Sequence, residues 1–293
     1  MGILLGLLTA ISWGSADFLA RFSTRKIGTL RTTLYMQLLG LALLSAALPF
    51  LGGWKHLADG SGWRPWAWGM SAGVLNTFAT LTLYRSFEIG KMAAVAPLSA
   101  AYPVITVLLS VLSGERLTLA RLLGIISALL GAVLVARAEN APASAQELDS
   151  VIAAQHRKGL VWAIVSSCAM GVMFWLLGVR IIPAVGALPA VWLIRLVSAV
   201  LTFVVILLAR QPATFPVAGS LRFVAGVAVL DTTAYALNNE GMRLEQVSIV
   251  SVLASLYGAV TVAYAAILLR ERISRSQWLG ILAIFAGIVL ISR

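Results

Sequence analysis

Glu115-Arg116-Leu117-Thr118 returns later in the chain as Glu271-Arg272-Ile273-Ser274. Each segment is followed by two glycines at the same spacing, Gly124 and Gly131 in the first and Gly280 and Gly287 in the second. The offset is 156 positions, and eight of the 22 residues from Glu115 to Ala136 are identical to their counterparts. The pattern indicates an internal duplication.

Further matches extend the duplication toward the front of each half. Gly2 and Gly14 correspond to Gly159 and Gly171 at an offset of 157. Gln37 falls opposite Arg195 at an offset of 158, and Asn76 opposite Asp231 at an offset of 155. Offsets this similar across several segments are not explained by one chance pair of glycines.

Apolar runs long enough to cross a bilayer, which takes roughly 20 residues, occur ten times. They are 2–22, 30–51, 66–86, 92–112, 119–137, 159–180, 188–209, 222–240, 246–268 and 275–292. We therefore predict an all-α polytopic membrane protein with ten transmembrane helices. It comprises a five-helix repeat at 1–137, a polar linker at 138–158 and a second five-helix repeat at 159–293. Because five is odd, the second repeat enters the membrane inverted, an arrangement typical of alternating-access transporters with a central site.

Composition excludes other classes of protein. Of 293 residues, 60% are hydrophobic and 11% charged, which is unlike a soluble domain or a disordered chain. A single cysteine, Cys168, rules out an intramolecular disulfide framework. The formal net charge of +11 does not require nucleic acid, because the basic residues gather at the ends of the runs. Fourteen lie on one side of the predicted bilayer and seven on the other, which places both termini outside.

Three charged residues lie within the predicted spans, where a charge needs a partner or a wet cavity. Two interpretations of Asp231 remain open. It could bind a substrate amine or carry a proton, or it could form a structural pair with Arg195. For Arg195 a structural role is favoured, because Gln37 holds the matching place. Asp17 falls toward the end of the first run, so we expect it to anchor a loop by pairing near Arg21 and Arg25.

Polar and aromatic side chains recur at helical spacing on repeat-related runs, so each stripe shares one face. For any single serine, close packing of helices explains the residue better. For the set, a shared cavity is the better explanation. The expected substrate-binding residues are Trp13, Asn76, Thr80, Tyr84, Ser99, Tyr102, Trp175, Asp231, Tyr235, Asn238, Ser251 and Tyr257.

Motifs of catalysis and metal binding are missing from the sequence. There is no Gly-rich loop ending in Gly-Lys-Ser/Thr, no His-Glu-x-x-His and no histidine within a predicted span. We therefore predict neither an enzyme nor a cofactor nor a metal site. Pro97 and Pro103 each remove a backbone donor and are expected to kink the fourth helix. Glu115 and Glu271 are expected to fix connections.

Three parts of the sequence resemble EamA-type members of the drug/metabolite transporter superfamily. They are Trp13-Gly14-Ser15, residues 94–103 together with 114–118, and residues 248–257 together with 270–273. The resemblance covers essentially the whole chain. It implies a ten-helix fold around a central cavity, and the relatives nearest in function are the ten-helix amino-acid exporters of the YddG type. The second half departs from the pattern, because Gly258-Ala259 replaces Tyr102-Pro103 and Met170 stands where the first half has Trp13.

The sequence thus predicts a secondary carrier of the bacterial inner membrane that exports small organic solutes, above all amino acids. Asp231 and Asn76 would contact polar ends of the substrate, and aromatic residues would cover its side chain. Proton coupling through Asp231 is left open. The alternatives are an exporter of drugs or other metabolites, including nucleotide sugars, and a membrane sensor or assembly protein that transports nothing.

Overall fold

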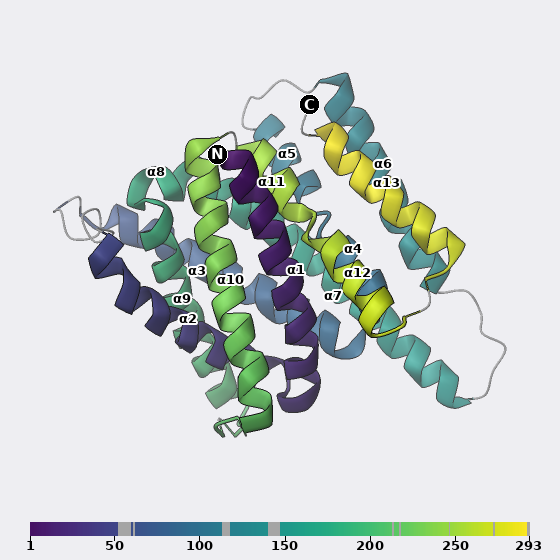
Figure 1. The fold of residues 1–293 in the computed structure, drawn as a ribbon, viewed down its shortest axis with the longest axis horizontal. Coiled ribbons are helices and arrows are strands. Elements are labelled where there is room, and N and C mark those ends of the chain that lie inside the picture. The colour runs from purple at the N-terminus through teal and green to yellow at the C-terminus, as the bar shows by residue number, and fades with distance from the viewer. Residues whose placement is uncertain are drawn as a thin grey trace.

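The computed structural model is built from helices (Figure 1). It describes residues 1–51, 60, 62–112, 118–139, 147–212, 214–216, 218–245, 247–271 and 273–291, and no strand occurs among them. The elements are α1 (Gly2–Ile27), α2 (Thr29–Leu51), α3 (Arg64–Ile89), α4 (Met92–Ser99), α5 (Pro103–Leu112), α6 (Leu119–Glu139), α7 (Glu147–Leu176), η1 (Leu177–Ile181), α8 (Ile182–Val185), α9 (Ala187–Leu208), α10 (Ala218–Leu244), α11 (Val247–Ser255), α12 (Tyr257–Leu268) and α13 (Arg275–Ile291).

Seven segments of the described chain are helical, long and apolar enough to cross a membrane. They are Gly2–Ile27, Thr29–Phe50, Met92–Leu109, Ala154–Val185, Ala187–Leu208, Gly219–Leu244 and Val250–Leu268. They correspond to seven of the ten predicted spans. The apolar part of α13, Arg275–Leu290, is shorter. Large apolar side chains such as Leu8, Ile11 and Phe203 lie exposed on the outside, which suits helices that face lipid.

Two of the predicted spans are interrupted near their middles. A turn at 100–102 divides the fourth into α4 and α5, and Leu256 divides the ninth into α11 and α12. Pro103 begins α5 and has no N–H to continue the ladder of α4, whereas Pro97 stays inside α4. The interruptions pack together, since a Cβ on Gly258 would lie 2.6 Å from that of Ala100.

The helix α7 begins at Glu147, well inside the predicted linker, which was expected to run to 158. Residues 147–158 contain glutamate, leucine, alanine, glutamine, lysine and arginine, which are strong helix formers. This segment contains no glycine or proline. The segment therefore extends the helix instead of ending it. Residues 140–146 of the linker lie outside the described part of the chain.

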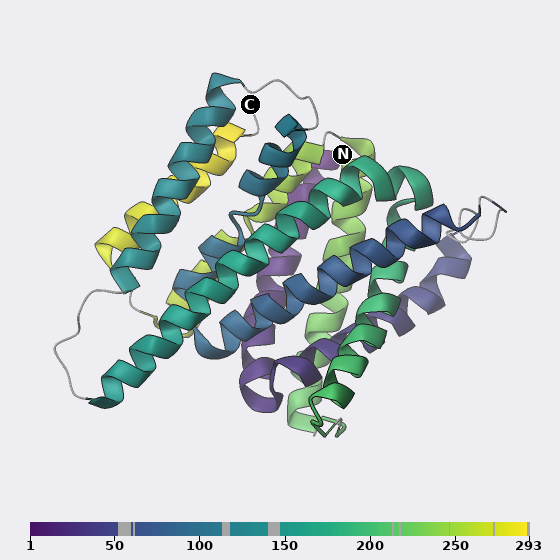
Figure 2. The same ribbon diagram turned by 180° about the vertical axis from the view of Figure 1, so that it is seen from behind.

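Helices from the two halves of the chain pair along their lengths. α1 packs on α10 and α3 on α7, while α2 packs on α9 and α6 on α13. The α6–α13 pair forms one edge of the molecule (Figure 1), and the view from behind shows α3 and α7 side by side (Figure 2). In the alignment of the two halves, α1 corresponds to α7 and α3 corresponds to α10. The α1–α10 pair and the α7–α3 pair therefore join corresponding helices.

Glu271 fixes a connection, as the sequence predicts. Its carboxylate forms an ion pair with Arg21 of α1 and accepts a hydrogen bond of 2.9 Å from the backbone N–H of Ala93, at the start of α4. A carboxylate at that position also meets the positive end of the helix dipole. The end of α1, the start of α4 and the turn before α13 are therefore held together. Its counterpart Glu115 lies outside the described residues.

The glycines of the repeat lie where helices approach most closely. A Cβ on Gly131 of α6 would stand 2.5 Å from the carbonyl oxygen of Gly280, and one on Gly287 of α13 would stand 2.5 Å from that of Gly124. The contact is reciprocal, with each glycine meeting the other helix at the corresponding place. Small residues permit such backbone approach in membrane helices.

We expect Gly131→Leu and Gly287→Leu each to separate α6 from α13, because the nearest atoms in front of the added side chain are backbone atoms of the other helix, which cannot turn away. The recovered protein should unfold at a lower temperature in detergent, measured by size-exclusion chromatography after heating. Gly219→Ala is the matched control, because nothing lies within 4 Å of a Cβ at that position. Unchanged melting of both leucine variants would contradict the close approach.

Candidate substrate cavity

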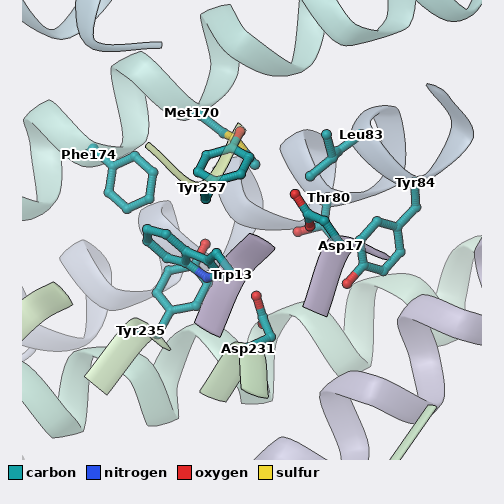
Figure 3. Close-up of a pocket in the computed structure, with 10 residues that line it drawn as sticks. All are labelled: Trp13, Asp17, Thr80, Leu83, Tyr84, Met170, Phe174, Asp231, Tyr235 and Tyr257. Carbon is teal, nitrogen blue, oxygen red and sulfur yellow. The ribbon is translucent and has the colours of Figure 1, made fainter. Parts of the chain in front are cut away.

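A narrow cavity lies among α1, α3, α7, α10 and α12, in the interior of the described structure (Figure 3). The cavity is small, with a volume of about 30 Å³. Aromatic residues make up half of its lining, and two carboxylates and a threonine supply polar groups. The lining residues are Trp13, Asp17, Thr80, Leu83, Tyr84, Met170, Phe174, Asp231, Tyr235 and Tyr257. A concave, largely apolar space with a few convergent polar groups is the usual form of a small-molecule site.

The structure brings six of the twelve predicted binding residues to this cavity. They are Trp13, Thr80, Tyr84, Asp231, Tyr235 and Tyr257. Thr80 and Tyr84 are one turn apart on α3, and Asp231 and Tyr235 are one turn apart on α10, so the helical spacing places each pair on one face.

The aromatic wall is organised around Trp13. Its ring lies 5.5 Å from the ring of Phe174, 5.2 Å from that of Tyr235 and 6.1 Å from that of Tyr257, centroid to centroid. The two tyrosine rings stand edge-on to the indole, an arrangement that aromatic side chains prefer. Rings that brace each other in this way keep a fixed shape around the space.

Asp231 is held by a fully buried arginine. Arg195 of α9 donates a hydrogen bond of 2.5 Å to Asp231 Oδ2 and another of 2.8 Å to Gln37 Oε1 of α2. Its guanidinium also lies 5.3 Å from the ring centre of Tyr235. The structural pairing considered for Asp231 is therefore confirmed, and the same carboxylate also faces the cavity.

The expected role of Asp17 in anchoring a loop is wrong. Arg21 pairs with Glu271, and Arg25 donates to the carbonyl oxygens of Phe87 and Gly90. Because α1 continues to Ile27, Asp17 lies near the middle of the helix instead of at its end. Its side chain is 6% exposed and reaches the cavity beside Thr80 and Tyr84 (Figure 3).

The other six predicted residues do not line the cavity. Asn76 and Ser99 lie behind its wall: Asn76 Oδ1 accepts a hydrogen bond of 2.6 Å from Tyr235, and Ser99 Oγ one of 3.2 Å from Tyr257. Tyr102 donates to the backbone oxygen of Ser251 at 2.9 Å. The polar atoms without a hydrogen-bond partner in the described part of the chain include Trp175 Nε1, Asn238 Oδ1 and Ser251 Oγ.

Sequence reasoning missed four residues of the cavity wall: Asp17, Leu83, Met170 and Phe174. Asp17 follows Trp13 by one helical turn, and Phe174 follows Met170 by one turn, so helical spacing carried the signal in both cases. On α7 the prediction chose Trp175, the neighbour of the residue that points inward. Among the described residues, no group of three histidine, cysteine, aspartate or glutamate side chains could hold a metal ion.

Comparison with known proteins places this arrangement in a family. The model of the EamA-like transporter family matches the chain twice, over residues 1–137 and 157–293. The uncharacterized protein MJ1333.1 of Methanocaldococcus jannaschii is 31% identical over 134 residues, which are 45% of this chain and 94% of that protein. It is therefore about half as long.

A solved crystal structure superposes with a TM-score of 0.70 at 19% sequence identity, covering 99% of this chain and 95% of the other. At that identity the likeness shows the fold alone. The two family matches span nearly the whole chain. The chain therefore belongs to the EamA-like transporter family, in the drug/metabolite transporter superfamily, and is a multi-pass membrane protein.

Proposed function

We propose that the chain is a secondary carrier that exports small organic solutes, amino acids above all, across the bacterial inner membrane. The observation that carries the proposal is the cavity itself. It lies between helices from both halves of the chain, it is walled by aromatic rings, and it presents two carboxylates. Such a space suits a small solute with an ammonium group and an apolar side chain.

The proposed mechanism is alternating access between two inverted five-helix repeats, at 1–137 and 159–293, joined by a linker at 138–158. Support comes from the two matches to one family model and from the half-length relative. The reciprocal contacts of Gly131 and Gly287 support it as well, because an inverted repeat makes corresponding contacts across its pseudo-two-fold axis.

The cavity also bears on the choice of substrate. Asp17 and Asp231 supply negative charge, Thr80 a hydroxyl, and Trp13 an indole whose N–H suits a carboxylate oxygen. An amino acid would place its ammonium near the carboxylates and its side chain against the rings. Phosphate groups are disfavoured, because the guanidinium nearest the cavity, that of Arg195, already serves Asp231 and Gln37.

A second candidate is a carrier of organic cations of the drug type. It is favoured by the charges at the cavity, where Asp17 and Asp231 face a single guanidinium. A cation would balance the excess carboxylate, and rings attract cations through their faces. Amino acids and their decarboxylated amines therefore form the first set to test.

Transport by purified protein in liposomes tests the proposal directly. We expect uptake of L-phenylalanine or of its amine, phenethylamine, above that of empty vesicles. Trp13→Ala should weaken binding about tenfold, because the stacked wall loses its central ring. Trp278→Ala is the matched control, since that tryptophan is exposed on α13. If no amino acid or amine is bound or moved, the proposed substrate class is wrong.

The Arg195–Asp231 pair is tested by a double variant. Arg195→Met alone should abolish recovery of folded protein, because an unpaired buried charge costs about 3–5 kcal/mol. Adding Asp231→Asn removes that charge and should restore folding, measured as a monodisperse peak after extraction. If Asp231 contacts the substrate, the folded double variant should have a KM at least about tenfold higher. An unchanged KM would leave Asp231 a purely structural role.

A further inference from the structure

Two carboxylates face the cavity, and the structure treats them differently. Asp231 is joined to Arg195 at 2.5 Å. Asp17 Oδ2 is buried, and no hydrogen-bond partner for it exists in the described part of the chain. No cationic side chain of the described residues pairs with Asp17 either, because Arg21, one turn further on α1, is engaged by Glu271.

Both carboxylates lie deep along their helices. Asp231 is the central residue of α10. Asp17 lies two to three residues beyond the centre of α1, which corresponds to about 4 Å along the helix axis. A charge at such depth is costly unless a partner or water compensates it. An ionised Asp17 therefore requires a cation from outside the protein, and without that cation a proton is the available substitute.

The groups that face Asp17 do not supply the missing positive charge. From α10 come Asp231 and Tyr235, from α3 Tyr84, and from α12 Tyr257. The three tyrosine hydroxyls are neutral donors, and each donates to an acceptor other than Asp17. Tyr84 donates to Met36, Tyr235 to Asn76 and Tyr257 to Ser99. Arg195 lies beside the Tyr235 ring, but its guanidinium pairs with Asp231.

We propose that Asp17 is the exchange site of the carrier, holding a proton in the empty cavity and the ammonium group of the solute in the loaded one. This inference rests on the proposed function and specifies its coupling. When the ammonium arrives, the Asp17 carboxyl releases its proton to the water on that side. The bound cation takes the place of that proton, so one proton is exchanged for each cation. Asp231 takes no part in the exchange, because its carboxylate is already paired with Arg195.

The surroundings of Asp17 define the class of solute. Trp13 lies one turn away on the same face of α1, and with Tyr235 and Tyr257 it offers aromatic surface beside the carboxylate. Rings of this kind attract a desolvated cation and cover an apolar body. The structure therefore favours a primary amine with an apolar tail, with or without a carboxylate, over an acid that lacks the amine.

Three matched probes share one phenyl tail: phenethylamine, L-phenylalanine and 3-phenylpropanoate. We expect the first two to raise the melting temperature of the purified protein and the third to have no effect. In weak buffer, adding phenethylamine should release close to one proton per protein. In liposomes that contain the protein, a pH gradient should drive phenethylamine to accumulate severalfold above its level in empty liposomes under the same gradient.

Asp17→Asn should abolish proton release and gradient-driven accumulation while its melting temperature without ligand stays at or above that of the parent. Glu240→Gln is the matched control, because that carboxylate pairs with Arg243 at the end of α10, outside the cavity. It should keep both activities. If Asp17→Asn is not recovered folded, Asp17→Glu serves instead, and it should retain proton release with altered affinity.

The outcomes separate this inference from the proposed function. Proton release or gradient-driven accumulation by Asp17→Asn at the parental level would overturn the role of Asp17 and leave the carrier standing. Binding of 3-phenylpropanoate as tight as that of the amine would overturn it as well. If the parent protein moves none of the probes, the proposed substrate class fails first.

Discussion

A guanidinium with no exposed surface joins three helices in the interior of this protein. Arg195 extends from α9 and donates to Gln37 on α2 and to Asp231 on α10. In a bilayer such a charge must be compensated inside the protein, because lipid offers no hydrogen bonds. Gly40 makes room for it, since a Cβ there would lie 3.0 Å from the Arg195 Nε. The position of α10 at the cavity depends on this pair.

The same constraint acts on the broken helices. Tyr102 of the turn after α4 donates to the backbone oxygen of Ser251 in α11, and Tyr257 at the start of α12 donates to Ser99. Each interrupted helix thus satisfies polar groups of the other, close to the point where Gly258 meets Ala100. Interrupted helices leave backbone groups that need such partners. Their contact lies beside the cavity, because Tyr257 also lines it.

Sequence reasoning predicted the helical fold and six of the residues that line the cavity, because both depend on local spacing. The comparison of the two halves placed Gln37 opposite Arg195, 158 positions further on, and these two residues are in contact. Asp17 was misplaced because the first predicted span ended at 22, whereas α1 runs to Ile27. Arg21 pairs instead with Glu271, 250 positions away, a tertiary contact that sequence spacing does not reveal. Likewise, a polar stripe does not reveal whether it faces water or another polar side chain, and Asn76 faces Tyr235.

The corresponding positions of the two halves explain how the cavity acquires its polarity. At the offset of 157 that aligns Gly14 with Gly171, Trp13 corresponds to Met170 and Asp17 to Phe174, and all four line the cavity. The duplication therefore supplies one backbone framework twice, on α1 and on α7. Only the α1 copy carries the carboxylate and the indole, while the α7 copy presents a thioether and a phenyl ring (Figure 3). A site with two chemically equal ends would bind a solute in either direction. Here the α1 side carries a carboxylate and the α7 side carries only apolar groups, so the two sides of the cavity differ chemically.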